Sequence, residues 1–126
     1  MKPRFTSLAI ASLLVLGACG GEAGPSVLTG ENVILKMFDN RFEHTEVRIP
    51  VGGTVEFLGA GRNPHNAVAA DDSWSTEDAF GSLEQLEGDS AILTFDEPGT
   101  YTFFCTLHGN AEGSGMAAAL VVGGDA

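Results

Sequence analysis

Short runs in which apolar and polar residues alternate, separated by turn residues at regular intervals, constrain the fold of this chain more than any other feature. Alternation with a period of two is typical of a strand that buries one face. After residue 31 no stretch keeps an apolar period of 3.6 residues, so no long helix is expected there. The expected strands cover residues 33–37, 47–49, 54–58, 65–69, 91–95, 101–105 and 117–122.

The segments between these runs are typical of loops and turns. Residues 59–64 and 96–99 contain Gly, Pro and polar residues, which favour a loop and a tight turn. Residues 71–88 are acidic and rich in turn residues, so we expect an irregular segment with one helical turn near residues 75–80. Together the pattern predicts an all-β fold, a Greek-key β-sandwich of seven or eight strands in two antiparallel sheets.

The strand expected at residues 101–105 has a chemically unusual inner face. Its period of two places Tyr101, Phe103 and Cys105 on one side, and this side should face the core. Cys105 then lies at the end of the strand and points inward where the strand gives way to a loop.

The first residues have the pattern of an export signal. Lys2 and Arg4 are followed by an apolar stretch too short to span a bilayer, which predicts a signal peptide over residues 1–18. The sequence before Cys19 resembles a bacterial lipobox, in which this cysteine is lipidated; an ordinary cleavage site beside a chance cysteine is the alternative. Residues 19–31 are Gly-rich and indicate a tether to a single domain at residues 32–124.

The two cysteines, Cys19 and Cys105, would ordinarily suggest one disulfide in an exported protein. If Cys19 carries a lipid, Cys105 has no partner. A lone thiol in an oxidising compartment is liable to oxidation unless a metal occupies it. We therefore expect Cys105 to be a metal ligand.

The charge of the chain limits its partners. The formal net charge is −11, which argues against nucleic acid and against docking on anionic lipid by charge alone. It favours protein partners with basic docking surfaces. Several acidic pairs follow residue 70, and one of them could form a docking patch.

A thiol, an imidazole and a thioether lie close together near the C-terminus. Cys105 is followed by His108 and then, after seven residues, by Met116. This soft ligand set suits copper, because Cu(I) favours sulfur and Cu(II) accepts imidazole and thiolate. His65 lies where a loop meets an apolar run and can supply a second imidazole, whereas His44 lies in a polar stretch and is expected on the surface.

These residues resemble the cupredoxins, especially plastocyanin-like and halocyanin-like proteins, over roughly residues 33–123. The resemblance implies one type 1 copper ion bound by His65, Cys105 and His108, with Met116 as the axial ligand. It also implies that Asn66 and Thr106 tie the two ligand loops together and form hydrogen bonds around the thiolate.

The loop between His108 and Met116 is longer than the family's usual three or four residues. Its glycines could let the extra residues bulge outward while Met116 keeps its place before the last strand. Glu112 or a backbone carbonyl group are the alternative axial ligands.

The expected function is that of a membrane-anchored electron carrier rather than an enzyme. The sequence offers no second ligand cluster and no pair of nucleophile and base. Electrons should pass through His108, and the surface aromatic residue Phe104 marks a second route. We expect an exported monomer held at a membrane by Cys19. The alternative is a protein that stores or delivers copper at the membrane surface.

Overall fold

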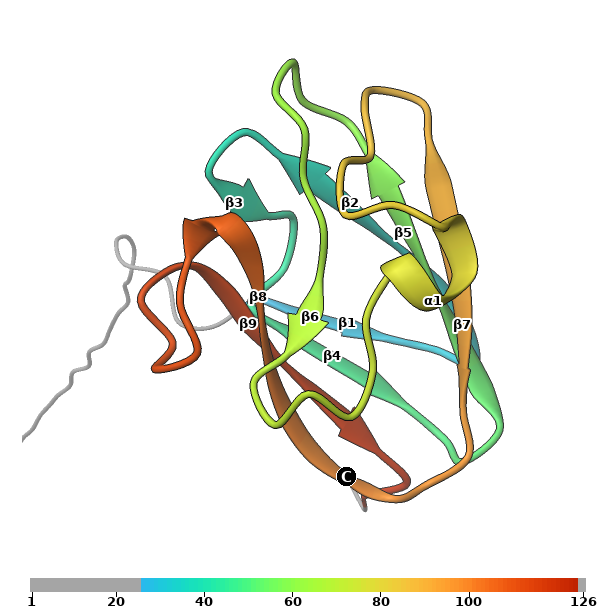
Figure 1. Cartoon of the computed structure of the whole chain (residues 1–126). Helices are drawn as coiled ribbons and strands as arrows, with labels where there is room; N and C mark the ends of the chain where they lie inside the picture. The colour runs from blue at the N-terminus through green and yellow to red at the C-terminus, as the bar shows by residue number, and fades with distance from the viewer. Residues whose placement is uncertain (1–25, 125–126) are drawn as a thin grey trace, which may run out of the picture.

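The computed structural model describes residues 26–124, which form nine strands and one helical turn (Figure 1). The elements are β1 (Val27–Thr29), β2 (Asn32–Phe38), β3 (Arg41–Phe42), β4 (Glu46–Ile49), β5 (Gly53–Gly59), β6 (Val68–Ala69), α1 (Glu77–Phe80), β7 (Ser90–Phe95), β8 (Gly99–Gly109) and β9 (Gly115–Val122). Strands β3 and β6 have only two residues each.

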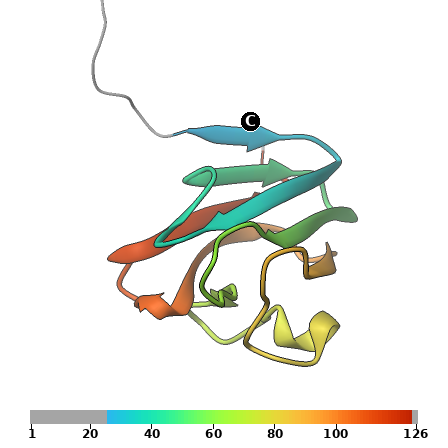
Figure 2. The same cartoon turned by 90° about the horizontal axis from the view of Figure 1, so that it is seen from above.

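The strands form two sheets that pack face to face. One sheet has the order β1-β4-β9-β8-β6 and the other has the order β3-β2-β5-β7. Seen from above, the sheets are two layers with the loop around α1 at one side (Figure 2). The predicted all-β sandwich is confirmed, with nine strands instead of the seven or eight predicted.

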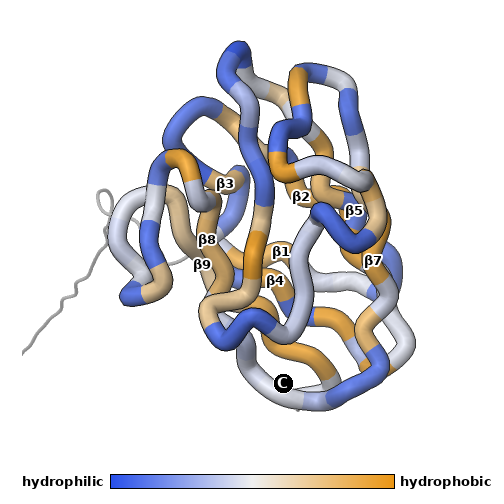
Figure 3. Tube along the Cα trace, viewed as in Figure 1, coloured by the Kyte–Doolittle hydropathy of each residue, from blue (hydrophilic) through white to orange (hydrophobic). Residues whose placement is uncertain are grey.

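The core between the sheets follows from the alternation of each strand. In β2, β5 and β9 every second residue is buried, and the apolar colour follows the strands while the loops are polar (Figure 3). Phe103 and Cys105 are fully buried on the inner face of β8, and Tyr101 is half-buried, as predicted. Edge-to-face contacts between Phe57, Phe103 and neighbouring aromatic rings fill the centre.

The structure corrects the prediction of two antiparallel sheets. Strand β2 pairs with β5 in parallel, and β4 pairs in parallel with both β1 and β9. The chain crosses between the sheets after β1 and after each of β3 to β7, so strands consecutive in sequence are seldom neighbours in a sheet. Both sheets are therefore mixed.

The prediction that residues 19–31 form a tether is partly wrong. Its residues Val27–Thr29 form β1, because the backbone of this segment pairs with β4 at Glu46–Arg48. The predicted signal peptide, Cys19 and the first part of the tether lie outside the described residues.

Two further strands differ from their predicted extents. Only Val68–Ala69 of the segment 65–69 is a strand, because the backbone of His65 bonds to Gln85 in a loop. Strand β8 continues past Cys105 to Gly109, so Cys105 is not its last residue.

The loops after β2, β5 and β8 lie toward one end of the sandwich, and the turns after β4 and β7 lie toward the other (Figure 1). The first end carries the histidines and the cysteine discussed below. Within residues 26–124 no helix has the length and apolar character needed to cross a membrane.

Candidate metal centre

Cys105 and His108 lie in an irregular part of β8. Regular pairing with β9 ends at Phe104, opposite Ala117, and resumes only at Gly109, opposite Gly115. Four residues of β8, 105–108, therefore lie opposite a single residue of β9, which is Met116. A bulge of this kind bends a strand and redirects its side chains, and here it brings the thiol and the imidazole to the part of the sheet where buried Met116 lies, next to the first residue of β9.

His65 is held from the other side by the loop that precedes β7. Its backbone N–H and C=O bond to the C=O and N–H of Gln85, each at 3.0 Å. The Gln85 side chain is itself buried and donates to the carbonyl oxygen of Phe57 at 3.0 Å. His65 is fully buried, and its position is fixed by backbone pairing rather than by its own strand.

Asn66 and Thr106 join the two segments that carry these side chains. The Oδ1 atom of Asn66 accepts from the backbone N–H of Thr106 at 2.9 Å, and Nδ2 donates to the Thr106 hydroxyl at 2.9 Å. Nδ2 also donates to the carbonyl oxygen of Leu83 at 2.9 Å. Asn66 is fully buried, so the side of these bonds that it supplies is shielded from water.

The side chains of His65, Cys105 and His108 converge on one point. Their ligand atoms all lie within 4.8 Å of one another. The Sγ atom of Cys105 is 3.9 Å from Nδ1 of His65 and 3.7 Å from Nδ1 of His108. Metal–nitrogen bonds of about 2.0–2.1 Å and metal–sulfur bonds of about 2.3 Å would let one ion between them reach all three.

The chemistry of this donor set fits copper. Two imidazoles and one thiolate in a trigonal arrangement, with a weak axial thioether, are typical of blue-copper sites. Cys105 is fully buried and is a free thiol among the described residues. His44 lies outside the cluster, since its Nδ1 atom bonds to the hydroxyl of Ser26 at 2.6 Å.

An acidic residue that the sequence analysis did not find completes the surroundings of His65. The Oδ1 atom of Asp39, in the turn after β2, lies 3.0 Å from Nε2 of His65. The hydrogen bond from the backbone N–H of Asn63, followed by that from His65, lowers the pKa of Asp39 from 3.8 to about 2. The carboxylate is therefore ionised at neutral pH.

The long loop after His108 forms a small hairpin of its own. Gly109 pairs with Gly115 across its base, and the N–H of Asn110 donates to the carbonyl oxygen of Ser114 at 3.1 Å. The Asn110 side chain caps the turn by accepting from the N–H groups of Glu112 and Ser114, each at 3.1 Å. The five residues 110–114 are all exposed, so the extra length projects away from the cluster.

Both glycines at the base of this hairpin are required by its geometry. A Cβ atom on Gly109 would lie 2.5 Å from the carbonyl oxygen of Met116. Gly115 has a φ of +73°, and a Cβ atom there would collide with the carbonyl oxygen of His108. This close approach of two backbones keeps His108 and Met116 near each other although seven residues separate them.

The surface around the cluster is partly apolar. His108 and Phe104 are half-buried, and Leu107 between them in sequence is 48% exposed. Residues 63–124 contain no Lys or Arg, so every basic residue of the domain comes from the first half.

Comparison with known proteins identifies a family. Residues 32–123 match the family described as copper binding proteins, plastocyanin/azurin family. The chain is 29% identical to amicyanin of Paracoccus versutus over 120 residues, which covers 86% of this chain and 88% of the relative. It is 34% identical to plastocyanin of Scenedesmus fuscus over 86 residues, which covers 64% of this chain and 85% of the relative.

A larger copper protein contains the same fold. The copper-containing nitrite reductase of Thermus scotoductus matches with a TM-score of 0.59 and 24% identity, over 90% of this chain and 25% of the reductase chain. At this identity the likeness concerns the fold alone.

Proposed function

The chain belongs to the plastocyanin/azurin family of copper-binding proteins, and from this premise we propose that it carries single electrons at a membrane surface. The observation that carries the proposal is the convergence of two imidazole Nδ1 atoms on the buried thiol of Cys105. Family membership and the donor set both support one type 1 copper ion as the cofactor.

We assign Nδ1 of His65, Sγ of Cys105 and Nδ1 of His108 as the three strong ligands, with Met116 as the weak axial ligand. When bound, copper supplies a one-electron couple between Cu(I) and Cu(II), and this ligand set accommodates both states. The bonds between Asn66 and Thr106 hold the two ligand segments together, so the donor atoms need to move little. Burial of the thiol keeps water away from it.

His108 is the side chain through which a partner can approach the site. It is half-buried, whereas His65 and Cys105 are fully buried. Phe104, covalently next to Cys105 and half-buried on the other face of β8, offers a second route. Replacing Phe104 with Leu and measuring transfer rates to several redox partners tests this route, and unchanged rates with all of them would exclude it.

The partners we propose are redox proteins with basic docking surfaces, and the protein itself acts as a monomer and not as an enzyme. Residues 63–124 contain acidic residues and no Lys or Arg, which supports a basic docking surface on the partner. Among the described residues one candidate metal cluster is found, whereas a multicopper oxidase or nitrite reductase needs a second copper centre.

We further propose that the protein is exported and anchored by a lipid on Cys19. The sequence around Cys19 and the Gly-rich segment after it support this location. Mass measurement of the mature N-terminus tests it directly. A Cys19→Ala variant should move from the membrane to the soluble fraction, and a variant that stays on the membrane would contradict the anchor.

The copper proposal is tested by adding Cu(II) to the purified protein. Intense blue absorption and a reversible one-electron couple are the expected results. Cys105→Ser should abolish both, because a hydroxyl does not replace the thiolate as a soft ligand. His44→Ala is the matched control, since His44 bonds to Ser26 and lies outside the cluster; it should keep the colour.

The same experiment separates electron transfer from copper storage or delivery. An electron carrier should hold copper against a mild chelator in both oxidation states. A colourless complex, or one that loses copper to the chelator, would contradict the electron-transfer proposal and favour storage or delivery.

A further inference from the structure

The carboxylate of Asp39 is held against His65 by the surrounding backbone. It follows β2, where Asn40 with a φ of 66° turns the chain toward β3. Its Oδ1 atom accepts from the backbone N–H of Asn63 at 3.0 Å and contacts Nε2 of His65 at 3.0 Å. Gly61 lies against the same oxygen, and a Cβ atom at residue 61 would overlap it.

This contact determines which nitrogen of His65 is free to bind a metal. An ionised carboxylate only accepts hydrogen bonds, so Nε2 must carry the proton of the neutral ring. The lone pair is then on Nδ1, the atom that lies 3.9 Å from the thiol. The hydrogen bond also makes the imidazole a stronger electron donor.

His108 has no equivalent support among the described residues. Its Nδ1 atom faces the thiol at 3.7 Å, but no described group forms a hydrogen bond with its Nε2 atom. Only one of the two imidazoles is therefore paired with a negative charge.

We propose that Asp39 is a positioning residue that fixes His65 as an Nδ1 ligand and favours Cu(II) over Cu(I), so that it lowers the reduction potential of the site. The proposal rests on the proposed copper function. An added negative charge stabilises the more positive ion more strongly, and the hydrogen bond to Nε2 carries this effect to the ligand atom.

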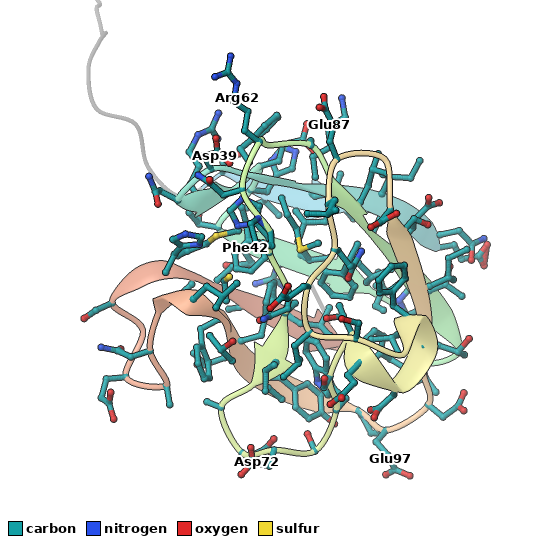
Figure 4. The ribbon with its side chains drawn as sticks, turned by 45° about the horizontal axis from the view of Figure 1, so that its top comes forward. Asp39, Phe42, Arg62, Asp72, Glu87 and Glu97 are labelled. Carbon is teal, nitrogen blue, oxygen red and sulfur yellow. The ribbon has the colours of Figure 1, made fainter. Side chains whose placement is uncertain are left out.

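The test uses the full chain with Asp39→Asn and Asp39→Ala. Asn has nearly the same shape and can still accept from Asn63 and His65, so it removes mainly the charge; Ala removes the hydrogen bond as well. Asp72→Asn is the matched control, because Asp72 is exposed and lies at the other end of the molecule from Asp39 and Arg62 (Figure 4).

The first readout is the reduction potential, measured by protein-film voltammetry with the affinity for Cu(I) and Cu(II). Loss of an outer hydrogen-bond partner costs about 10–100-fold in metal affinity. We expect this full loss for Cu(II) in Asp39→Ala and a part of it in Asp39→Asn, which keeps the hydrogen bond and loses the charge, with a smaller loss for Cu(I) in both variants. Each tenfold difference raises the potential by about 59 mV. Equal losses for both ions, with an unchanged potential, would mean a merely structural role and would overturn the proposal.

The second readout needs no metal and separates this proposal from the proposed function. Nitrogen NMR of the metal-free protein distinguishes the two tautomers of His65. We expect the Nε2–H form in the wild type and in Asp72→Asn, and a mixture in Asp39→Ala. An Nδ1–H form in the wild type would overturn the proposal even if copper binds. Failure of the wild type to bind copper, with the Nε2–H form present, would count against the proposed function and leave the positioning of His65 by Asp39 supported.

Discussion

His65 and His108 place their Nδ1 atoms 3.9 and 3.7 Å from the same thiol, yet their surroundings differ. His65 is fully buried, paired through its backbone with Gln85 and bonded to Asp39. His108 is half-buried and is followed by an exposed hairpin that closes on itself. One side of the site is built for rigidity and the other for access, as an electron carrier requires.

The largest expected effect comes from removing each imidazole in turn. Both His65→Gly and His108→Gly should abolish the blue absorption, because each removes one of three strong ligands. Added imidazole should restore the colour in His108→Gly, whose vacant position adjoins solvent, and not in His65→Gly. Titration of each copper-loaded variant with imidazole measures this, and equal rescue of both variants would contradict the difference in access.

The next effect compares two glycines of the hairpin. Gly113→Ala should cost about 1–2 kcal/mol of unfolding free energy, since its φ of +94° disfavours a side chain although the space around it is open. Gly115→Ala should cost about 3 kcal/mol, because the added Cβ atom also collides with the carbonyl oxygen of His108. Denaturant unfolding of the metal-free variants measures both; similar costs would show that the base of the hairpin adapts easily.

A smaller effect compares two asparagines that organise the two sides. Asn66→Ala should lower the unfolding free energy by about 2 kcal/mol, because the part-buried N–H of Thr106 and carbonyl of Leu83 lose their partner. Asn110→Ala in the exposed hairpin should cost less than about 1 kcal/mol, since water replaces its bonds. Thermal and denaturant unfolding of both variants test the order, and the reverse order would break the comparison.

The smallest effect concerns charge on the exposed hairpin that follows His108. Glu112→Gln should slow reduction of the oxidised protein by a cationic complex such as hexaammineruthenium(II) by about two- to threefold at low salt, because it removes an attractive charge from the exposed hairpin that follows His108. The difference should vanish at high salt, where screening is strong. Asp72→Asn, at the opposite end of the molecule from Asp39 (Figure 4), should leave the rate nearly unchanged in stopped-flow measurements. An equal effect of both variants would mean that only net charge matters.

The sequence was sufficient for the residues of the cluster whose spacing is local. Cys105 and His108 are three residues apart, and the period of two within residues 101–105 correctly placed Cys105 on the buried face. The sandwich followed from the same alternation. Short segments were harder, because the three residues of β1 carry too little pattern to distinguish a strand from a tether.

Asp39 could not be predicted because nothing in the sequence relates it to His65, which is 26 residues away. Their contact arises only when the turn after β2 meets the loop after β5. The prediction of a strand over residues 65–69 was partly wrong for a related reason. The backbone of His65 pairs with Gln85, which lies in a loop without alternating apolar and polar residues. The only local feature that set Asp39 apart was its position next to Asn40, a residue typical of turns.

The pairing of Gly109 with Gly115 has a consequence for how this protein can change. Because the hairpin is closed at its base, the number of residues beyond that base is independent of the distance between His108 and Met116. Segments of other lengths and compositions could be grafted between residues 110 and 114 without redesigning the metal site. The domain thus carries a modular attachment point beside its redox centre, suited to a recognition peptide or an electrode-binding tag.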